Sequence, residues 1–250
     1  MIARFSEAIR LLTRHFGLFA AIILTVWLPG NLLINYIAYH VADAGDMGFM
    51  KLNMWIEGIF GPIYIGALIF ALFRIKSGHV VTYKEAIGVG LKNWGSLFAA
   101  RLVAGLLMGL GFIALIIPGL ILAVRYSLLD AAVIIEGKGT SQSRARSTEL
   151  SIGRCWQIFW SAILFFILLT IFSFVIYLPL GSVESLNIMP VEVILDCIFD
   201  IAYAVIQIVI FLFYWEATQA NQGAEPAPLP DGSPAAGSPS GEHRRSPVTA

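Results

Sequence analysis

Charged residues inside long apolar stretches are the candidate functional residues of this chain. Arg101, Arg125 and Asp130 lie within one apolar stretch, and Asp196 and Asp200 lie one helical turn apart in another. A charged side chain at the middle of a bilayer costs roughly 2.5 to 3.5 kcal/mol on insertion scales. Each of these side chains therefore needs a partner or a hydrated cavity, and together they form the candidate buried charge network.

The composition indicates that these apolar stretches lie in a membrane. Of the 250 residues, 58% are apolar and only 13% are charged, and the mean hydropathy is +0.81. A water-soluble domain has about twice that charged fraction, so several stretches must face lipid. The two cysteines, Cys155 and Cys197, match no metal or redox spacing, so we expect reduced thiols.

Apolar stretches of about 20 residues predict membrane-spanning helices. Residues 95–135 are too many for one span, and Pro118 with Gly119 divides them into two spans joined by a tight turn. The sequence therefore predicts an all-α, polytopic membrane helix bundle of six spans. The other four predicted spans are residues 16–36, 54–73, 156–178 and 191–215.

The remaining segments are predicted as loops, surface helices and a tail. Residues 41–53 and 179–190 are polar enough to be loops. Residues 1–216 form the predicted transmembrane domain, and residues 217–250 form a disordered cytoplasmic tail because they are rich in Pro, Gly and Ser.

Three cytoplasmic amphipathic helices are expected on the membrane surface, each one before a pair of spans. They cover residues 2–14, about 83–93 with Thr82 as N-cap, and about 141–154. Glu7-Ala8-Ile9 recurs as Glu85-Ala86-Ile87, each followed at the same offset by an aromatic residue and a glycine. Two interpretations stay open: a threefold repeat, or the general resemblance of amphipathic helices that enter membranes.

Basic residues predict the orientation, because cytoplasmic loops carry an excess of Lys and Arg. We expect a bacterial inner membrane protein with both termini cytoplasmic, since the opposite side carries only Lys51. The cytoplasmic set is Arg4, Arg10, Arg14, Arg74, Lys76, Lys84, Lys92, Lys138, Arg144, Arg146 and Arg154.

Depth in the predicted spans suggests which charges meet. Arg101 and Asp130 each lie about six residues from the cytoplasmic end of an antiparallel pair of spans of about 20 residues, so we expect them to pair. Arg125 lies at a depth similar to that of Asp196 and Asp200, which predicts a second cluster. Glu192, Tyr203 and Gln207 extend the face of Asp196 and Asp200.

A scattered motif runs through the middle of the chain and resembles a known family. Ile117-Pro118-Gly119 is followed by Glu136-Gly137 and by Ala145-Arg146-Ser147. With Leu150, Gly153 and Trp156, these residues resemble the membrane domain of bacterial glycerophosphoryl diester phosphodiesterases and related uncharacterised multi-pass membrane proteins. In the bifunctional relatives the phosphodiesterase chemistry resides in a separate soluble barrel with metal-binding residues. The resemblance therefore implies a membrane architecture and no enzymatic activity for this chain.

The sequence leaves two functional hypotheses for the charged face. One is a non-enzymatic membrane protein that interacts with lipids or with a partner, in which the charges only fix helix packing. The other is a small transporter or lipid-translocating protein that uses the charged face as a polar path. Membrane lipids are the expected partners; no motif indicates a metal, a cofactor or nucleic acid, and no protein partner is identified.

Overall fold

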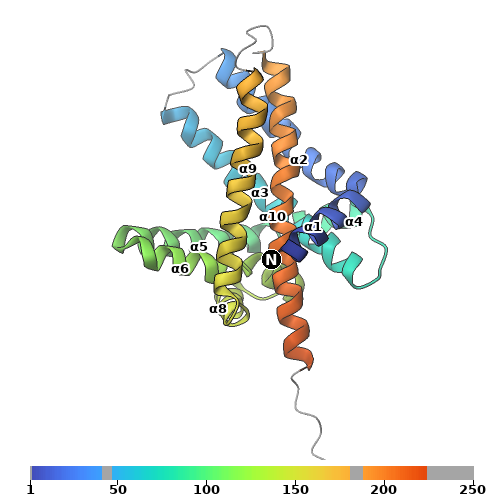
Figure 1. Ribbon diagram of the computed structural model, residues 1–250, viewed down its shortest axis with the longest axis vertical. Coiled ribbons are helices and arrows are strands. Elements are labelled where there is room, and N and C mark those ends of the chain that lie inside the picture. Colours follow the sequence, from blue (N-terminus) through green and yellow to red (C-terminus); the bar gives the residue numbers. More distant parts are fainter. Residues whose placement is uncertain (1, 41–46, 181–187, 224–250) are drawn as a thin grey trace, which may run out of the picture.

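The structure is a computed structural model that describes residues 2–40, 47–180 and 188–223, and every regular element in those ranges is a helix (Figure 1). Six helical segments there are long and apolar enough to cross a membrane. The predicted all-α bundle with six apolar spans is therefore confirmed. The helices are α1 (Ile2–Arg14), α2 (Phe16–His40), α3 (Met47–Lys76), α4 (Tyr83–Lys92), α5 (Trp94–Ala114), α6 (Ile116–Tyr126), α7 (Leu129–Glu136), α8 (Thr140–Ser151), α9 (Cys155–Leu180) and α10 (Met189–Gly223).

The centre of the molecule is α3, which packs against α2, α4, α5, α7 and α10. In its apolar window 61% of the residues are buried, against 11% in α9, so α9 turns most of its apolar surface outward. Leu68 and Leu72 of α3 are fully buried beside Phe19 of α2 and Phe213 of α10. Burial of such large apolar side chains contributes about 1.5 to 3 kcal/mol each and fixes how the helices sit around α3.

The α5–α6 hairpin extends sideways from the axis of α9 and α10 (Figure 1). Its turn is the single extended residue Leu115, and not Pro118 with Gly119 as predicted. Pro118 lies in the first turn of α6, where its missing N–H has no helical acceptor to lose. Gly119 instead allows close helix packing, because a Cβ there would lie 2.5 Å from the ring of Phe112 in α5.

Two helices extend beyond their predicted ends. The structure begins α3 at Met47, inside the segment predicted to be a loop, although residues 41–46 lie outside the described range. It continues α10 to Gly223, so residues 217–223 are helical and not part of a tail. No proline occurs between Ala217 and Gly223, and Ala217 is fully buried, so nothing stops the helix there. The remainder of the predicted tail, residues 224–250, lies outside the described residues.

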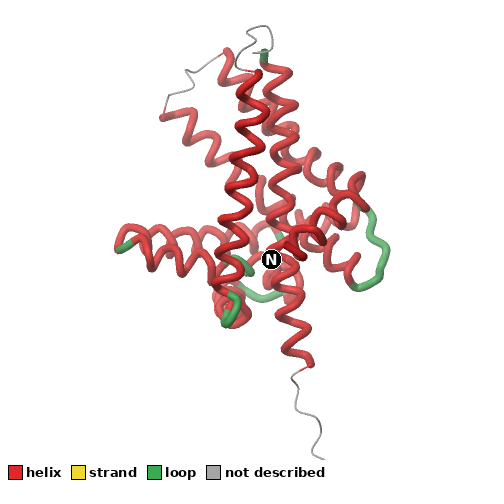
Figure 2. The backbone as a smooth tube through the Cα atoms, viewed as in Figure 1, coloured by secondary structure: helices red, strands yellow, loops and turns green. Residues whose placement is uncertain are grey.

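The three short helices α1, α4 and α8 each precede a long apolar helix, and tight connections join most of the elements (Figure 2). Thr82 is confirmed as the N-cap of α4: its hydroxyl accepts from the Glu85 backbone N–H, and Glu85 accepts from the Thr82 backbone in return. The Thr82 backbone N–H and hydroxyl both donate to the Glu85 carboxylate, and these two hydrogen bonds hold the pKa of Glu85 below its usual value. Ala8 and Ala86, equivalent in the proposed repeat, are both fully buried. The repeat and the location of these helices on a membrane surface stay predictions.

Candidate functional site

The predicted pair of Arg101 and Asp130 is present, with α5 and α7 bringing the two side chains together. Arg101 donates from Nε to Asp130 Oδ1 at 2.9 Å and from Nη2 to Oδ2 at 2.8 Å. This two-pronged geometry is the strongest form of an arginine–carboxylate contact. Asp130 is mostly buried, at 14% exposure, whereas Arg101 keeps 35% because it also faces a cavity. The second terminal nitrogen, Nη1, lies beside Gly61 of α3 and takes no part in the pair.

Asp196 and Asp200 meet asparagines of α2 and not Arg125. Asn31 donates to Asp200 and Asn35 donates to Asp196, each at 2.7 Å. Both asparagines are buried, and they lie one helical turn apart, as the aspartates do. Two parallel hydrogen bonds therefore join α2 to α10. An amide satisfies a carboxylate without cancelling its charge, so these aspartates contribute negative charge to their surroundings.

The predicted cluster of Arg125 with Asp196 and Asp200 is therefore wrong. The prediction assumes a straight fourth span, but residues 116–136 form two helices with a break at Ser127 and Leu128, and α6 extends sideways. Arg125 is exposed at the end of α6, and its side chain forms no ion pair within the described residues. The sequence analysis did not identify Asn31 and Asn35 as partners of the aspartates. Their four-residue spacing in an apolar helix matches that of the aspartates and could have indicated the pairing.

A polar cavity of about 310 Å³ joins the two groups of charges, and we call it the Arg101 cavity. It lies between α2, α3, α5, α9 and α10, and Arg101, Glu57 and Asp200 are the charged residues in its wall. Tyr203 and Gln207 of α10 also line it, as the predicted polar face requires. The complete lining is Trp27, Asn31, Ile34, Glu57, Gly61, Tyr64, Ile65, Arg101, Leu169, Phe199, Asp200, Tyr203 and Gln207.

Two further cavities adjoin the Arg101 cavity, one at each end. The Asp196 cavity, about 420 Å³, shares Asn31 and Asp200 with it. The Asp130 cavity, about 340 Å³, shares Arg101 and Gln207. The three together follow one face of α10, the face of Asp196, Asp200, Tyr203 and Gln207, which we call the α10 polar face. The Arg101–Asp130 pair lies where the Arg101 cavity meets the Asp130 cavity.

The Glu136-Gly137 part of the motif has a structural role at Glu136. This carboxylate accepts from Arg146 of α8 at 3.1 Å and from the hydroxyl of Tyr214 of α10 at 2.9 Å, and it forms an ion pair with Lys138. Gly137 then ends α7 with φ of +63°, a conformation that glycine adopts without strain. Glu136 therefore connects α7 to both α8 and α10.

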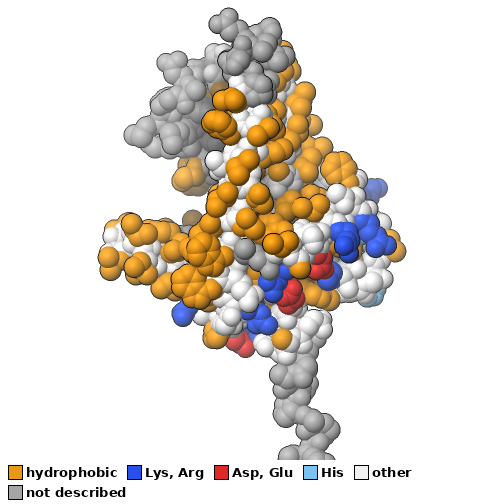
Figure 3. Space-filling model, viewed as in Figure 1, with side chains coloured by type: hydrophobic (Ala, Val, Ile, Leu, Met, Phe, Trp, Pro, Cys, Tyr) orange, Lys and Arg blue, Asp and Glu red, His pale blue; other side chains and the backbone are white. Residues whose placement is uncertain are grey.

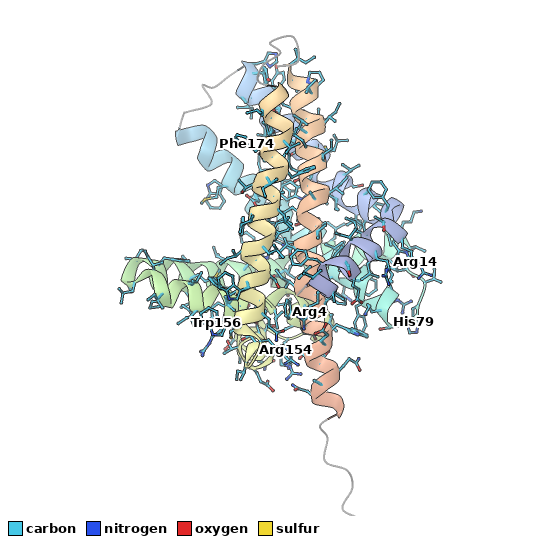
Figure 4. The ribbon with its side chains drawn as sticks, in the orientation of Figure 1. Arg4, Arg14, His79, Arg154, Trp156 and Phe174 are labelled. Atoms are coloured by element: carbon cyan, nitrogen blue, oxygen red, sulfur yellow. The ribbon has the colours of Figure 1, made fainter. Side chains whose placement is uncertain are left out.

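Other motif residues lie at the connections between consecutive helices. Gly153, with φ of +75°, makes the turn between α8 and α9, and Leu150 is buried. Trp156 at the start of α9 is largely exposed (Figure 4). Ser147, fully buried, donates to the Arg125 carbonyl at 2.6 Å and accepts from the Leu128 N–H at 3.2 Å. Ser147 thus satisfies backbone groups on both sides of the break between α6 and α7.

Replacing Ser147 with alanine is expected to lower the free energy of unfolding by about 2 kcal/mol, because the buried Leu128 N–H loses its acceptor. Ser151→Ala is the matched control. Ser151 is equally buried on α8, but its hydroxyl donates only to Thr148 of the same helix, so its loss should cost less than about 1 kcal/mol. Thermal unfolding of the detergent-solubilised protein measures both. Equal losses would show that Ser147 does not hold the break.

Comparisons with known proteins give one partial match. No family model matches the chain, and no solved structure matches it. Over 88 residues it is 31% identical to a UPF0259 membrane protein from Pectobacterium carotovorum subsp. carotovorum (strain PC1), and the match spans 35% of this chain and 35% of that protein. None of the comparisons supports the resemblance to the glycerophosphoryl diester phosphodiesterase membrane domain. The chain is a multi-pass membrane protein that is similar, over about a third of its length, to a bacterial UPF0259 membrane protein.

Proposed function

We propose that this chain is a non-enzymatic protein of the bacterial inner membrane that takes a polar lipid headgroup into the Arg101 cavity and passes it along the α10 polar face. The observation that carries the proposal is the cavity itself. A network that served only helix packing would be dry around its paired charges, whereas Arg101, Glu57 and Asp200 all face open volume.

The size and surroundings of the cavity favour a lipid over a soluble molecule. About 310 Å³ is at the lower limit of ligand pockets, enough for a small polar group. The lining includes residues of α3 and α9, and both helices expose large apolar side chains, including Trp55, Phe60 and Phe166. A headgroup inside the cavity could therefore leave its acyl chains in the surrounding lipid.

Charge distribution supports an orientation with both termini in the cytoplasm. Lys and Arg side chains gather around α1, α4 and α8, while the far half of α9 is apolar (Figure 3). The labelled Arg4, Arg14 and Arg154 lie at this end and Phe174 lies far from it (Figure 4). Cationic side chains at a cytoplasmic surface meet anionic headgroups, each contributing about 1 kcal/mol of attraction. In this orientation the Asp196 end of the α10 polar face is the outer end.

Cysteine labelling tests the proposal directly. In a background of Cys155→Ser and Cys197→Ala, single cysteines at positions 196, 200, 203 and 207 are exposed to a membrane-impermeant thiol reagent. We expect labelling at all four positions, because these side chains line the three adjoining cavities.

Two control positions on α10 make the result interpretable. A cysteine at Ala204, fully buried next to Tyr203, should stay unlabelled, as should one at Ile198, which is exposed on the apolar surface and would face lipid. Absence of labelling at all four test positions in a folded protein would contradict the proposal and leave a charge network that serves packing alone.

A further inference from the structure

We infer that the Arg101 cavity selects the zwitterionic headgroup of an aminophospholipid, with the phosphate at Arg101 and the primary ammonium at Glu57 and Asp200. This inference rests on the proposed function, since it specifies which headgroup the cavity accepts.

The positive end of the cavity is the free edge of the Arg101 guanidinium. Asp130 occupies Nε and Nη2, which leaves the donors on Nη1 beside Gly61, a residue of the cavity wall. Arginine donors are well suited to phosphate oxygens. Tyr203 and Gln207 add a hydroxyl and a carboxamide to the same wall. A phosphate bound here would thus meet several donors and not a single charge.

The negative part of the cavity is formed by Glu57 and Asp200. Asp200 receives a hydrogen bond from the neutral amide of Asn31, so its charge is not cancelled. Glu57 forms no ion pair with any residue that the structure describes. The positive charge of Arg101 is matched by Asp130, so the cavity as a whole retains an excess of negative charge. An anionic headgroup alone would add to this excess, whereas a primary ammonium offsets part of it and donates hydrogen bonds to the carboxylates.

The order of the two charges along α10 matches the order within such a headgroup. Asp200 lies toward the Asp196 end of the α10 polar face, and Arg101 lies at the Gln207 end, where the cavity meets the Asp130 cavity. In the proposed orientation the ammonium is then outermost and the phosphate deeper. In a phospholipid of the outer leaflet the ammonium likewise lies on the water side of the phosphate.

The cavity is flanked by apolar helices through which acyl chains could leave. Gly61 of α3 and Leu169 of α9 both line it, so it lies between these helices. The N-terminal half of α3 diverges from α9 in Figure 1. A phospholipid is far larger than about 310 Å³, so only its headgroup can enter while its chains stay in the bilayer.

The test is the lipid that the full-length chain retains from a defined mixture. The protein is reconstituted in vesicles of equimolar phosphatidylethanolamine and phosphatidylglycerol, extracted mildly, and its bound lipids are quantified by mass spectrometry. We expect phosphatidylethanolamine to be enriched about tenfold, the ratio that corresponds to one charge-assisted contact. In the double variant Glu57→Gln, Asp200→Asn the ratio should fall to about one, because the ammonium loses both carboxylates while the phosphate keeps Arg101.

The matched control is the double variant Glu7→Gln, Glu149→Gln, which removes the same two charges from residues that line none of the described cavities. Its lipid ratio should equal that of the unmodified chain. Soluble phosphoethanolamine distinguishes a lipid from a free ligand: it should not displace the lipid, and displacement at equal concentration would overturn the assignment to a lipid.

The two proposals fail in different ways. Retained phosphatidylethanolamine and phosphatidylglycerol in equal amounts, together with labelled cysteines at positions 200 and 203, would overturn the headgroup assignment and leave the proposed function standing. No retained lipid and no labelling would overturn both. An enrichment that persists in the Glu57→Gln, Asp200→Asn variant would show that other residues select the headgroup.

Discussion

Arg101→Gln is expected to lower the free energy of unfolding by about 3 kcal/mol, because it leaves the mostly buried carboxylate of Asp130 without its partner. The loss is large because removing one partner of a buried ion pair leaves the other charge buried and unpaired. The intact pair itself contributes little to the net free energy of unfolding. Removing both charges, in Arg101→Gln with Asp130→Asn, should therefore recover at least half of the loss. Denaturant or thermal unfolding in detergent measures all three proteins.

Glu149→Gln provides the reference for an exposed ion pair. Arg146 and Glu149 are three residues apart on α8, and Glu149 is 59% exposed, so this substitution should cost less than about 0.5 kcal/mol. If Arg101→Gln costs no more than Glu149→Gln, then Asp130 is solvated and the pair is not a structural contact.

The double variant also separates the structural role of Arg101 from its role in the cavity. A chain that is stable again without the two charges should still retain less lipid of either kind, because the cavity then lacks the guanidinium that binds the phosphate. Restored stability with unchanged lipid retention would assign the pair to helix packing alone.

Gly90→Ala is expected to destabilise the protein by about 2 to 3 kcal/mol, despite the better helix propensity of alanine. Gly90 of α4 packs directly on the backbone of α3. An added Cβ would overlap the carbonyl oxygen of Ile63 and lie 3.1 Å from the amide nitrogen of Ala67. A backbone atom of a packed helix cannot rotate away, so α4 must shift from its position.

Gly88→Ala is the matched control on the same helix. Gly88 is exposed, and a Cβ there would meet nothing within 4 Å, so the substitution should stabilise α4 by up to about 1 kcal/mol. Thermal unfolding of both variants checks the contact between α3 and α4. A neutral Gly90→Ala would mean that α4 lies farther from α3 than the structure places it.

Local chemistry in the sequence determined the helices and some of their ends. Apolar stretches of sufficient length predict the spans, since backbone N–H and C=O groups inside a bilayer can form hydrogen bonds only with one another. Thr82 and Glu85 predict the start of α4, because the capping contact involves only residues three apart. The Arg101–Asp130 pair could also be predicted from the sequence, because a tight hairpin between neighbouring helices places residues equally far from its open end at the same depth.

The sequence could not determine contacts that depend on how the helices are inclined. Arg125 and the aspartates of α10 have similar predicted depths, yet the break at Ser127 and Leu128 turns α6 sideways and leaves Arg125 exposed. That break contains no proline or glycine. Its free backbone groups form hydrogen bonds with Ser147, a residue of a later helix.

By itself, then, the sequence determined that this chain is a six-span helical membrane protein with a polar face on its last span. The contacts of that face depend on the packing of the helices: Asn31 and Asn35 of α2 lie at one end, and a cavity lined by Arg101 lies at the other. The physical reason is that hydropathy and capping act within a few neighbouring residues, whereas the partners of a buried charge are chosen by the packing of helices far apart in the chain.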